Sequence, residues 1–213
     1  MFGIHDLTVF VVSGLLLNIL PGPDSLLIMA RSASQGWRAG SAAALGIGAG
    51  TFVHIIAAAL GLSAVLATSA AAFTVVKLVG AAYILYMAYE LLTSKRADAA
   101  AAPSMPAVRA LPYATIFRQG FLTNVLNPKV ALFFLAFVPQ FIDAQAPHKA
   151  LAFILLGCIF NVNGMLWCHA LALFTATASA RLQVDPRVAL WLKRSTGGLF
   201  VWIGVKLALS KQH

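Results

Sequence analysis

Two charged side chains stand directly after proline-containing interruptions of apolar segments. The charged residues are Asp24 and Lys129. The interruptions before them are Pro21, Gly22 and Pro23 in the first case, and Asn127 and Pro128 in the second. Proline has no N–H group and clashes with the preceding helical turn, so a helix must break at both places. Each break falls well inside a long apolar segment, where an unpaired charge is costly.

A carboxylate and an amine at these breaks suit the binding of a zwitterion. Asp24 would hold an α-ammonium group or a proton. Lys129, with the free N–H groups that start the second half-helices, would suit an α-carboxylate, because helix N-termini carry partial positive charge. The alternative is a permanent Asp24–Lys129 ion pair that locks the two parts of the chain together or serves as a gate.

Amide and imidazole side chains stand near the same breaks. Asn18 and Asn124 each come three residues before a break, where we expect them to satisfy backbone groups that the prolines leave without partners. Asn161, in a later apolar segment, either does the same or lines the path. His54 and His169 either relay protons or, as a lone intramembrane histidine more often does, form helix-to-helix hydrogen bonds.

The sequence lacks the residues that several other functions would need. The sequence has no nucleotide-binding glycine loop, nucleophile elbow or cluster of metal ligands, so we expect neither an enzyme nor an ATP-driven pump, and no cofactor. A transmembrane thiol–disulfide electron carrier would need cysteines beside the breaks. Cys158 and Cys168 instead share another segment, and their spacing places them about 15 Å apart along a helix.

The elements that must position these residues are membrane-spanning helices. Of the 213 residues, 61% are hydrophobic and 10% are charged, against about a quarter charged in a soluble domain. The apolar runs reach the length that crosses a bilayer. We expect six spans, at Leu7–Ala30, Gly40–Leu66, Phe73–Leu92, Ile116–Phe141, Ala150–Ala176 and Leu190–Leu209. The net charge of +9 lies in short loops beside these runs, which makes nucleic-acid binding an unnecessary explanation.

The basic residues predict the orientation of the chain. Ten of the fifteen follow the first span, surround the connection between the third and fourth, or fill the connection between the fifth and sixth. By the positive-inside rule this side is cytoplasmic, so both termini should face the periplasm. The N-terminus has no basic residue before its apolar stretch, so we expect the first span to be retained rather than cleaved as a signal peptide.

The two halves of the sequence resemble each other. GLLLNILPGPD, starting at Gly14, matches GFLTNVLNPK, starting at Gly120, and KLVGAAYILYMAYEL, starting at Lys77, matches RSTGGLFVWIGVKLA, starting at Arg194. Three spans per half is an odd number, so the second half must enter the membrane from the opposite side. We expect an all-α membrane protein of one domain, residues 1–213, in which two inverted three-helix repeats have Pro-broken first and fourth helices. The repeats cover about 1–95 and 114–213, with a cytoplasmic linker at about 96–113.

Gly46 and Gly50 form a small-xxx-small pair in the second span. Such a pair lets two helices approach closely. The partner helix belongs either to the same chain or to a second copy in a homodimer.

Three stretches of the sequence resemble the lysine/threonine exporter family, also called the LysE or RhtB type. They are PGPDSLLIMARSASQGWRAG (Pro21–Gly40), LGIGAGTFVH (Leu45–His54) and FRQGFLTNVLNPKVALFFLAFVPQF (Phe117–Phe141). The resemblance implies efflux of amino acids or their derivatives, driven by the proton motive force, by a six-helix protein of the bacterial cytoplasmic membrane. It also implies functional roles for the PGP motif with Asp24 and for Asn124, Asn127, Pro128 and Lys129.

The distribution of acidic residues bears on the substrate. Asp24 is the only acidic residue placed deep in a predicted span, and a cationic side chain would want a second buried carboxylate. We therefore expect neutral amino acids, such as threonine, homoserine or branched aliphatic ones, as substrates. Cationic amino acids and metal cations are the alternatives, although His54 and His169 alone make a poor metal site.

Overall fold

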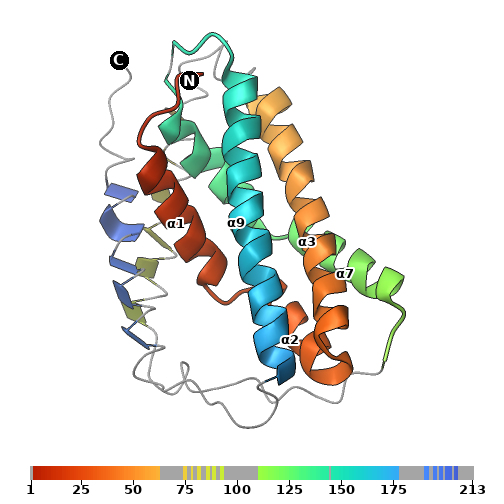
Figure 1. Ribbon diagram of the computed structural model, residues 1–213. Coiled ribbons are helices and arrows are strands. Elements are labelled where there is room, and N and C mark those ends of the chain that lie inside the picture. Colours follow the sequence, from red (N-terminus) through yellow and green to blue (C-terminus); the bar gives the residue numbers. More distant parts are fainter. Residues whose placement is uncertain are drawn as a thin grey trace.

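The computed structural model describes residues 2–62, 110–143 and 145–177, with scattered positions between 74 and 93 and between 190 and 205. Within this part of the chain every regular element is a helix, and the single isolated β-bridge joins Ile4 to Ile142. The prediction of an all-α protein is confirmed to that extent. Figure 1 shows the helices running roughly side by side along one direction.

The first predicted span is broken, as the PGP motif requires. Helix α1 (Leu7–Ile19) is followed by α2 (Pro23–Gln35), and the two axes are bent by 53°. The last hydrogen bond of α1 runs from the Leu20 N–H to the Leu16 carbonyl. Pro23 occupies the first turn of α2, where its missing N–H is not needed. Helix α2 ends at Gly36, whose φ of 81° lies in the region that favours glycine.

The second broken pair lies where the NPK sequence predicts it. Helix α7 (Tyr113–Val125) is followed by α8 (Pro128–Leu132), the π-helical turn η2 (Phe133–Phe137) and the 3₁₀ turn η3 (Val138–Phe141). The bend between the two parts is 47°. Asn127 caps α8, because its side-chain oxygen accepts a hydrogen bond from the Lys129 N–H at 3.0 Å.

Two unbroken helices are long and apolar enough to cross a membrane. One runs over Trp37–Gly61 and comprises α3 (Trp37–Ala57) and most of the π-helical turn η1 (Ala58–Leu62). The other is α9 (Lys149–Thr177). With each bent pair counted as one span, the described residues supply up to four spans. The predicted spans Phe73–Leu92 and Leu190–Leu209 and most of the linker lie largely outside the described residues, so the six-helix inverted repeat stays a prediction.

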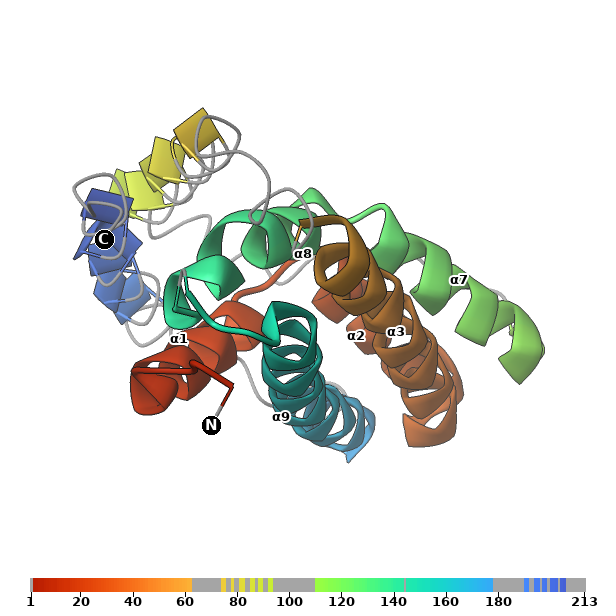
Figure 2. The ribbon, with the colours of Figure 1, turned by 90° about the horizontal axis from the view of Figure 1, so that it is seen from above.

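Glycines bring α3 and α7 into close contact. A Cβ on Gly46 would collide with the Phe117 carbonyl oxygen, and one on Gly50 would lie 2.8 Å from the Phe121 carbonyl oxygen. Gly120 of α7 likewise faces the backbone of Ala43. The small-xxx-small pair therefore packs against a helix of the same chain. Seen from above, α7 flanks one side of α3 and α9 lies on the other (Figure 2).

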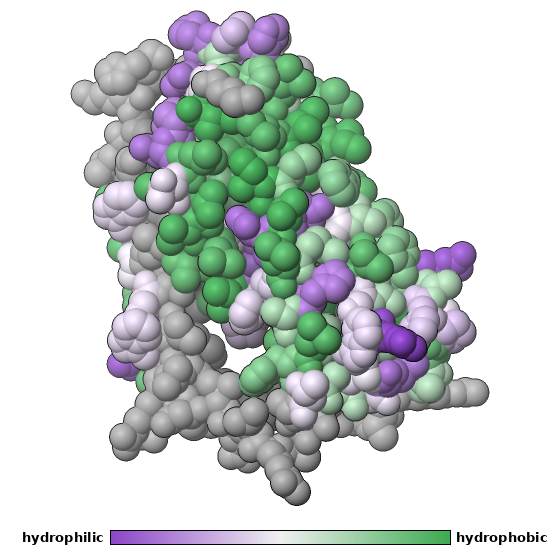
Figure 3. All heavy atoms as spheres, viewed as in Figure 1, coloured by the Kyte–Doolittle hydropathy of each residue, from purple (hydrophilic) through white to green (hydrophobic). Residues whose placement is uncertain are grey.

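Pairings between distant parts of the sequence define two ends of the molecule. At one end the Asp143 N–H donates to the Gly3 carbonyl at 2.8 Å, and the His5 N–H donates to Phe141. At the other end the Gln35 side chain both donates to and accepts from the backbone of Leu111. Figure 3 shows apolar side chains over much of the upper and central part of the face in view, hydrophilic ones at the top edge, and a mixture of both lower down. An extended apolar surface of this kind suits contact with a bilayer.

Candidate substrate site

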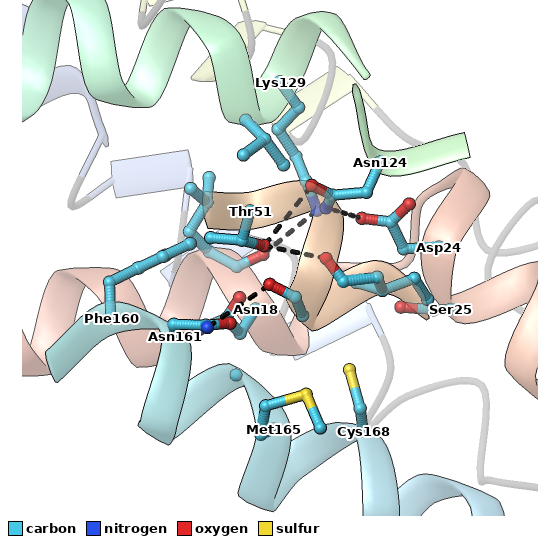
Figure 4. Close-up of a pocket in the computed structure, with 15 residues that line it drawn as sticks. Asn18, Asp24, Ser25, Thr51, Asn124, Lys129, Phe160, Asn161, Met165 and Cys168 are labelled. Carbon is cyan, nitrogen blue, oxygen red and sulfur yellow. Dashed lines mark hydrogen bonds between the residues drawn. The ribbon is translucent and has the colours of Figure 1, made fainter. Parts of the chain in front are cut away.

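The two broken pairs and the two unbroken helices enclose a small cavity between them. Its polar lining includes Asn18, Asp24, Ser25, Thr51, Asn124, Lys129 and Asn161, and its apolar lining includes Leu17, Ile47, Val130, Phe160 and Met165. The cavity holds about 30 Å³, which is room for about two water molecules. Figure 4 shows Asp24, Asn124 and Lys129 gathered on one side, opposite residues of α9.

Asp24 joins the two breaks. Its Oδ2 accepts hydrogen bonds from Asn124 Nδ2 at 2.9 Å and from Asn127 Nδ2 at 3.1 Å, both from the second broken pair. Its Oδ1 is buried and has no hydrogen-bond partner within the described part of the chain. One oxygen of this carboxylate is thus held in place by the second broken pair, and the other has no partner among the residues that the structure describes.

Lys129 replaces a backbone donor that Pro21 removes. In a continuous helix the Leu17 carbonyl would accept from the N–H of residue 21, but that residue is proline. The Lys129 ammonium group donates instead to the Leu17 oxygen at 3.1 Å and to the Leu20 oxygen at 3.2 Å. A Cβ on Gly22 would lie only 3.3 Å from this Nζ, so glycine leaves space for the lysine. The C-terminal end of α1 also carries partial negative charge, which favours a cation there.

This arrangement corrects the roles predicted for Asn18 and Asn124, and it bears on the predicted Asp24–Lys129 ion pair. The sequence assigned the carbonyls exposed by the break in the first span to Asn18, whereas Lys129 binds them. Asn124 donates to Asp24 rather than to an exposed carbonyl. Among the described residues, the ion pairs within 4 Å all involve His5. A permanent Asp24–Lys129 ion pair is therefore not present in this conformation.

Asn124 is the centre of a network that reaches α3. Its side-chain oxygen accepts a hydrogen bond from Thr51 Oγ1 at 3.3 Å. Its backbone carbonyl oxygen is 3.0 Å from His54 Nε2. His54 therefore makes a helix-to-helix hydrogen bond, and it also stacks on Phe134. Sequence reasoning missed Thr51. The signal that would have found it is its position three residues before His54, which places both on one face of the helix.

The remaining predicted residues divide into those that line the cavity and those that shape the backbone. Asn161 lines the cavity, which is one of the two roles predicted for it, and it donates to the Gly48 carbonyl at 3.3 Å, a group of α3 and not of a proline break. Asn18 lines the cavity, and its buried Nδ2 has no partner among the described residues. The residues that shape the two breaks without lining the cavity are Pro21, Gly22, Pro23, Asn127 and Pro128. Among the described residues, the hydrogen bond of His169 is to the Met165 carbonyl of its own helix.

Two other potential ligand types are placed by the structure. Cys158 and Cys168 are both free thiols, and Cys168 lines the cavity. Within the described residues no three side chains of His, Cys, Asp or Glu come together as a metal site.

At the start of α2, Gly22 offers no side-chain cap, so the first N–H groups of that helix lack partners inside it.

Comparisons with known proteins agree with this architecture. The profile of a family described as LysE type translocator matches residues 15–211. The chain is 32% identical to an uncharacterized membrane protein of Pseudomonas aeruginosa, with 97% of this chain and 96% of that protein covered. It is 30% identical to an uncharacterized membrane protein of Bacillus subtilis, over 97% and 100% respectively, and 26% identical to the leucine efflux protein of Salmonella typhimurium, over 97% and 96%. No solved structure matches.

Proposed function

The chain belongs to the LysE type translocator family, and from that premise we propose that it exports small neutral amino acids from the bacterial cytoplasm in exchange for protons. It is a multi-pass membrane protein. The observation that carries the proposal is the partly buried carboxylate of Asp24, which lines the cavity and is bonded through one oxygen to the second broken pair, while the other oxygen has no partner among the described residues.

Exchange follows from what a single carboxylate can hold. A protonated Asp24 has no negative charge for an α-ammonium group, and an Asp24 paired with an ammonium group is held in its charged form. The proton and the substrate therefore compete for the same oxygen atoms. If the cavity opens alternately to the two sides of the membrane, a proton that enters from one side is carried across before the substrate replaces it.

The lining of the cavity favours a neutral, aliphatic substrate. Asp24 is the one carboxylate among the lining residues, so the α-ammonium group of a substrate uses the available negative charge. The apolar wall formed by Ile47, Val130 and Phe160 suits an aliphatic side chain. One relative is named a leucine efflux protein, and this name supports leucine as the first substrate to test.

The cavity holds less space than an amino acid needs. About 30 Å³ accepts about two water molecules, so a leucine molecule enters only when the helices move apart. We infer that transport passes through at least one other conformation in which this cavity is wider. The bends at the two breaks are the natural hinges, because the backbone there lacks helical hydrogen bonds.

We also propose the bacterial inner membrane as the location, with both termini in the periplasm. Arg31 and Arg38 lie on either side of the turn at Gly36, at the end of the molecule where Gln35 meets Leu111. This end would face the cytoplasm. A homodimer stays a prediction, to which the Gly46–Gly50 pair contributes no surface because it is used inside the chain.

The test is transport by purified protein in proteoliposomes with an imposed proton gradient. We expect wild-type protein to accumulate labelled leucine against its gradient, in the direction opposite to proton flow. Asp24→Asn removes the carboxylate that is proposed to carry the proton, so the proton gradient should no longer drive leucine movement. Asp143→Asn is the matched control, because Asp143 is exposed at the end of η3 and away from the cavity.

Two results would refute the proposal. Wild-type protein that moves no neutral amino acid would refute the substrate class. Unchanged coupling in Asp24→Asn would remove this carboxylate as the proton carrier.

A further inference from the structure

Two residues that line the cavity each have a buried polar atom without a partner among the described residues, and the two atoms are of opposite chemical type. Asp24 Oδ1 is a hydrogen-bond acceptor, and Asn18 Nδ2 is a donor. Several polar groups around them are paired: Asp24 Oδ2 accepts two amides, Thr51 donates to Asn124, and Asn161 donates to Gly48. Besides the third N–H of Lys129, the described lining residues therefore offer one buried acceptor and one buried amide donor without a partner.

A buried amide without a partner is unfavourable to the folded protein. Packing alone would be served better by an apolar side chain of similar size, such as leucine. The neighbouring helix nevertheless leaves room for the amide. A Cβ on Gly164 of α9 would lie 3.2 Å from Asn18 Oδ1 and 3.3 Å from Nδ2. The space and the unpaired donor together indicate a group that serves a ligand rather than the fold.

The charge around Asn18 is suited to an anion. Asn18 belongs to the last turn of α1, in the same turn as the Leu17 carbonyl that binds Lys129. The lysine supplies a positive charge there, and two of its three N–H donors are used by Leu17 and Leu20. It thereby offsets the negative end of the α1 dipole, which alone would repel an anion.

We propose that Asn18 binds the α-carboxylate of the substrate while Asp24 binds the α-ammonium group. This inference rests on the proposed function and makes it more specific, because it fixes which end of the zwitterion lies on each side of the first break. Lys129 acts as a positioning residue that stays on the α1 carbonyls and contributes charge. The substrate class is then an amino acid with a free carboxylate, and analogues that lack this charge should be poor ligands.

The experiment measures competition against labelled leucine in proteoliposomes. The competitors are unlabelled leucine and leucinamide, which keeps the amine and the side chain but has an uncharged amide in place of the carboxylate. The quantity of interest is the ratio of the two inhibition constants in one preparation, which does not depend on how much protein is active. Asn18→Leu removes the donor, and Asn18→Asp keeps the size but replaces the donor with an acceptor.

We expect wild-type protein to prefer leucine, and Asn18→Leu to lower that preference by about 10- to 100-fold, the range for losing a hydrogen bond to a charged group. Asn18→Asp should reverse the preference in favour of leucinamide. Asn163→Leu is the matched control, since Asn163 lies on α9 but does not line the cavity. It should leave the ratio unchanged.

Outcomes that overturn the inference are distinct from those that overturn the function. Equal loss of leucine and leucinamide binding in both Asn18 variants would mean that Asn18 only supports the structure. An unchanged ratio would mean that it does not meet the carboxylate. In both cases proton-coupled leucine transport by wild-type protein would leave the proposed function intact. Wild-type protein that transports no amino acid would overturn both.

Discussion

At the residue scale, Lys129 performs a task that usually belongs to a backbone N–H group. Its ammonium group binds two carbonyls at the end of α1, one of which lost its normal donor to Pro21. Because it comes from the second broken pair, it also ties that pair to the first. Its charge is held by helix-end dipoles rather than by a carboxylate within 4 Å.

Lys129→Met should therefore destabilise the protein as well as impair transport. It leaves two buried carbonyls without donors, which costs about 1–3 kcal/mol for each group. Lys129→Gln retains an amide donor and should lose less. Thermal unfolding of the purified variants in detergent measures this difference, with leucine transport assayed on the same preparations.

The same substitution at Lys149, the first residue of α9, is the control. Lys149→Met should change the unfolding temperature little, since this side chain is at the end of a span and not in its centre. A Lys129→Met protein as stable as wild type would show that the two carbonyls need no donor from Lys129.

At the scale of the elements, the sequence predicts where the spans break, but it does not predict which distant residues bond to the backbone at the breaks. Proline chemistry is local, so both breaks are predictable from a few residues. The four described spans lie close to their predicted bounds. The Lys129 bonds to α1 join residues 109 and 112 positions apart, and no local pattern specifies such a pair.

Two further features of the elements had weak or no signals in the sequence. The π-helical turn Phe133–Phe137 is a run of apolar residues that reads as ordinary helix. Its rings pack into an aromatic cluster with Phe10 and Phe160, which depends on contacts between three separate elements. Thr51 was missed because a threonine in an apolar span commonly bonds to its own helix, as this one also does with the Ile47 carbonyl.

The contact between α3 and α7 yields a prediction about glycine. Gly46→Ala and Gly120→Ala each place a methyl group against backbone atoms of the opposing helix. Overpacking of this kind costs about 1–3 kcal/mol, so both variants should unfold at lower temperature than wild type. Gly61→Ala is the control, because nothing lies within 4 Å of a Cβ at that position. Equal stability of all three variants would contradict the close contact.

At the scale of the whole molecule, the hydrogen-bonded ends assign residues to the two sides of the membrane. Asp143 lies at the end where the N-terminal residues pair with η3, and Ser34 lies near the opposite end, beside the Gln35–Leu111 contact. Both side chains are exposed. Their positions allow the proposed orientation to be measured directly.

A membrane-impermeant maleimide should label Asp143→Cys but not Ser34→Cys in intact cells with a permeable outer membrane. Both variants would be made in a Cys158→Ser, Cys168→Ser background, so that no other thiol reacts. Inside-out vesicles should give the opposite pattern. Labelling of Ser34→Cys from outside would reverse the proposed topology and with it the direction of the positive-inside assignment.

The partners of Asp24 are 100 and 103 residues further along the chain. A ribosome adds about 5–20 residues per second. For roughly 5–20 s after Asp24 is synthesised, the Asn124 and Asn127 side chains that bind it do not yet exist. During insertion the first break must be accommodated by lipid headgroups, water or the insertion machinery, with Asp24 protonated or kept near the surface. The site is thus assembled late in biosynthesis, when the second break arrives and supplies the groups that the first one lacks.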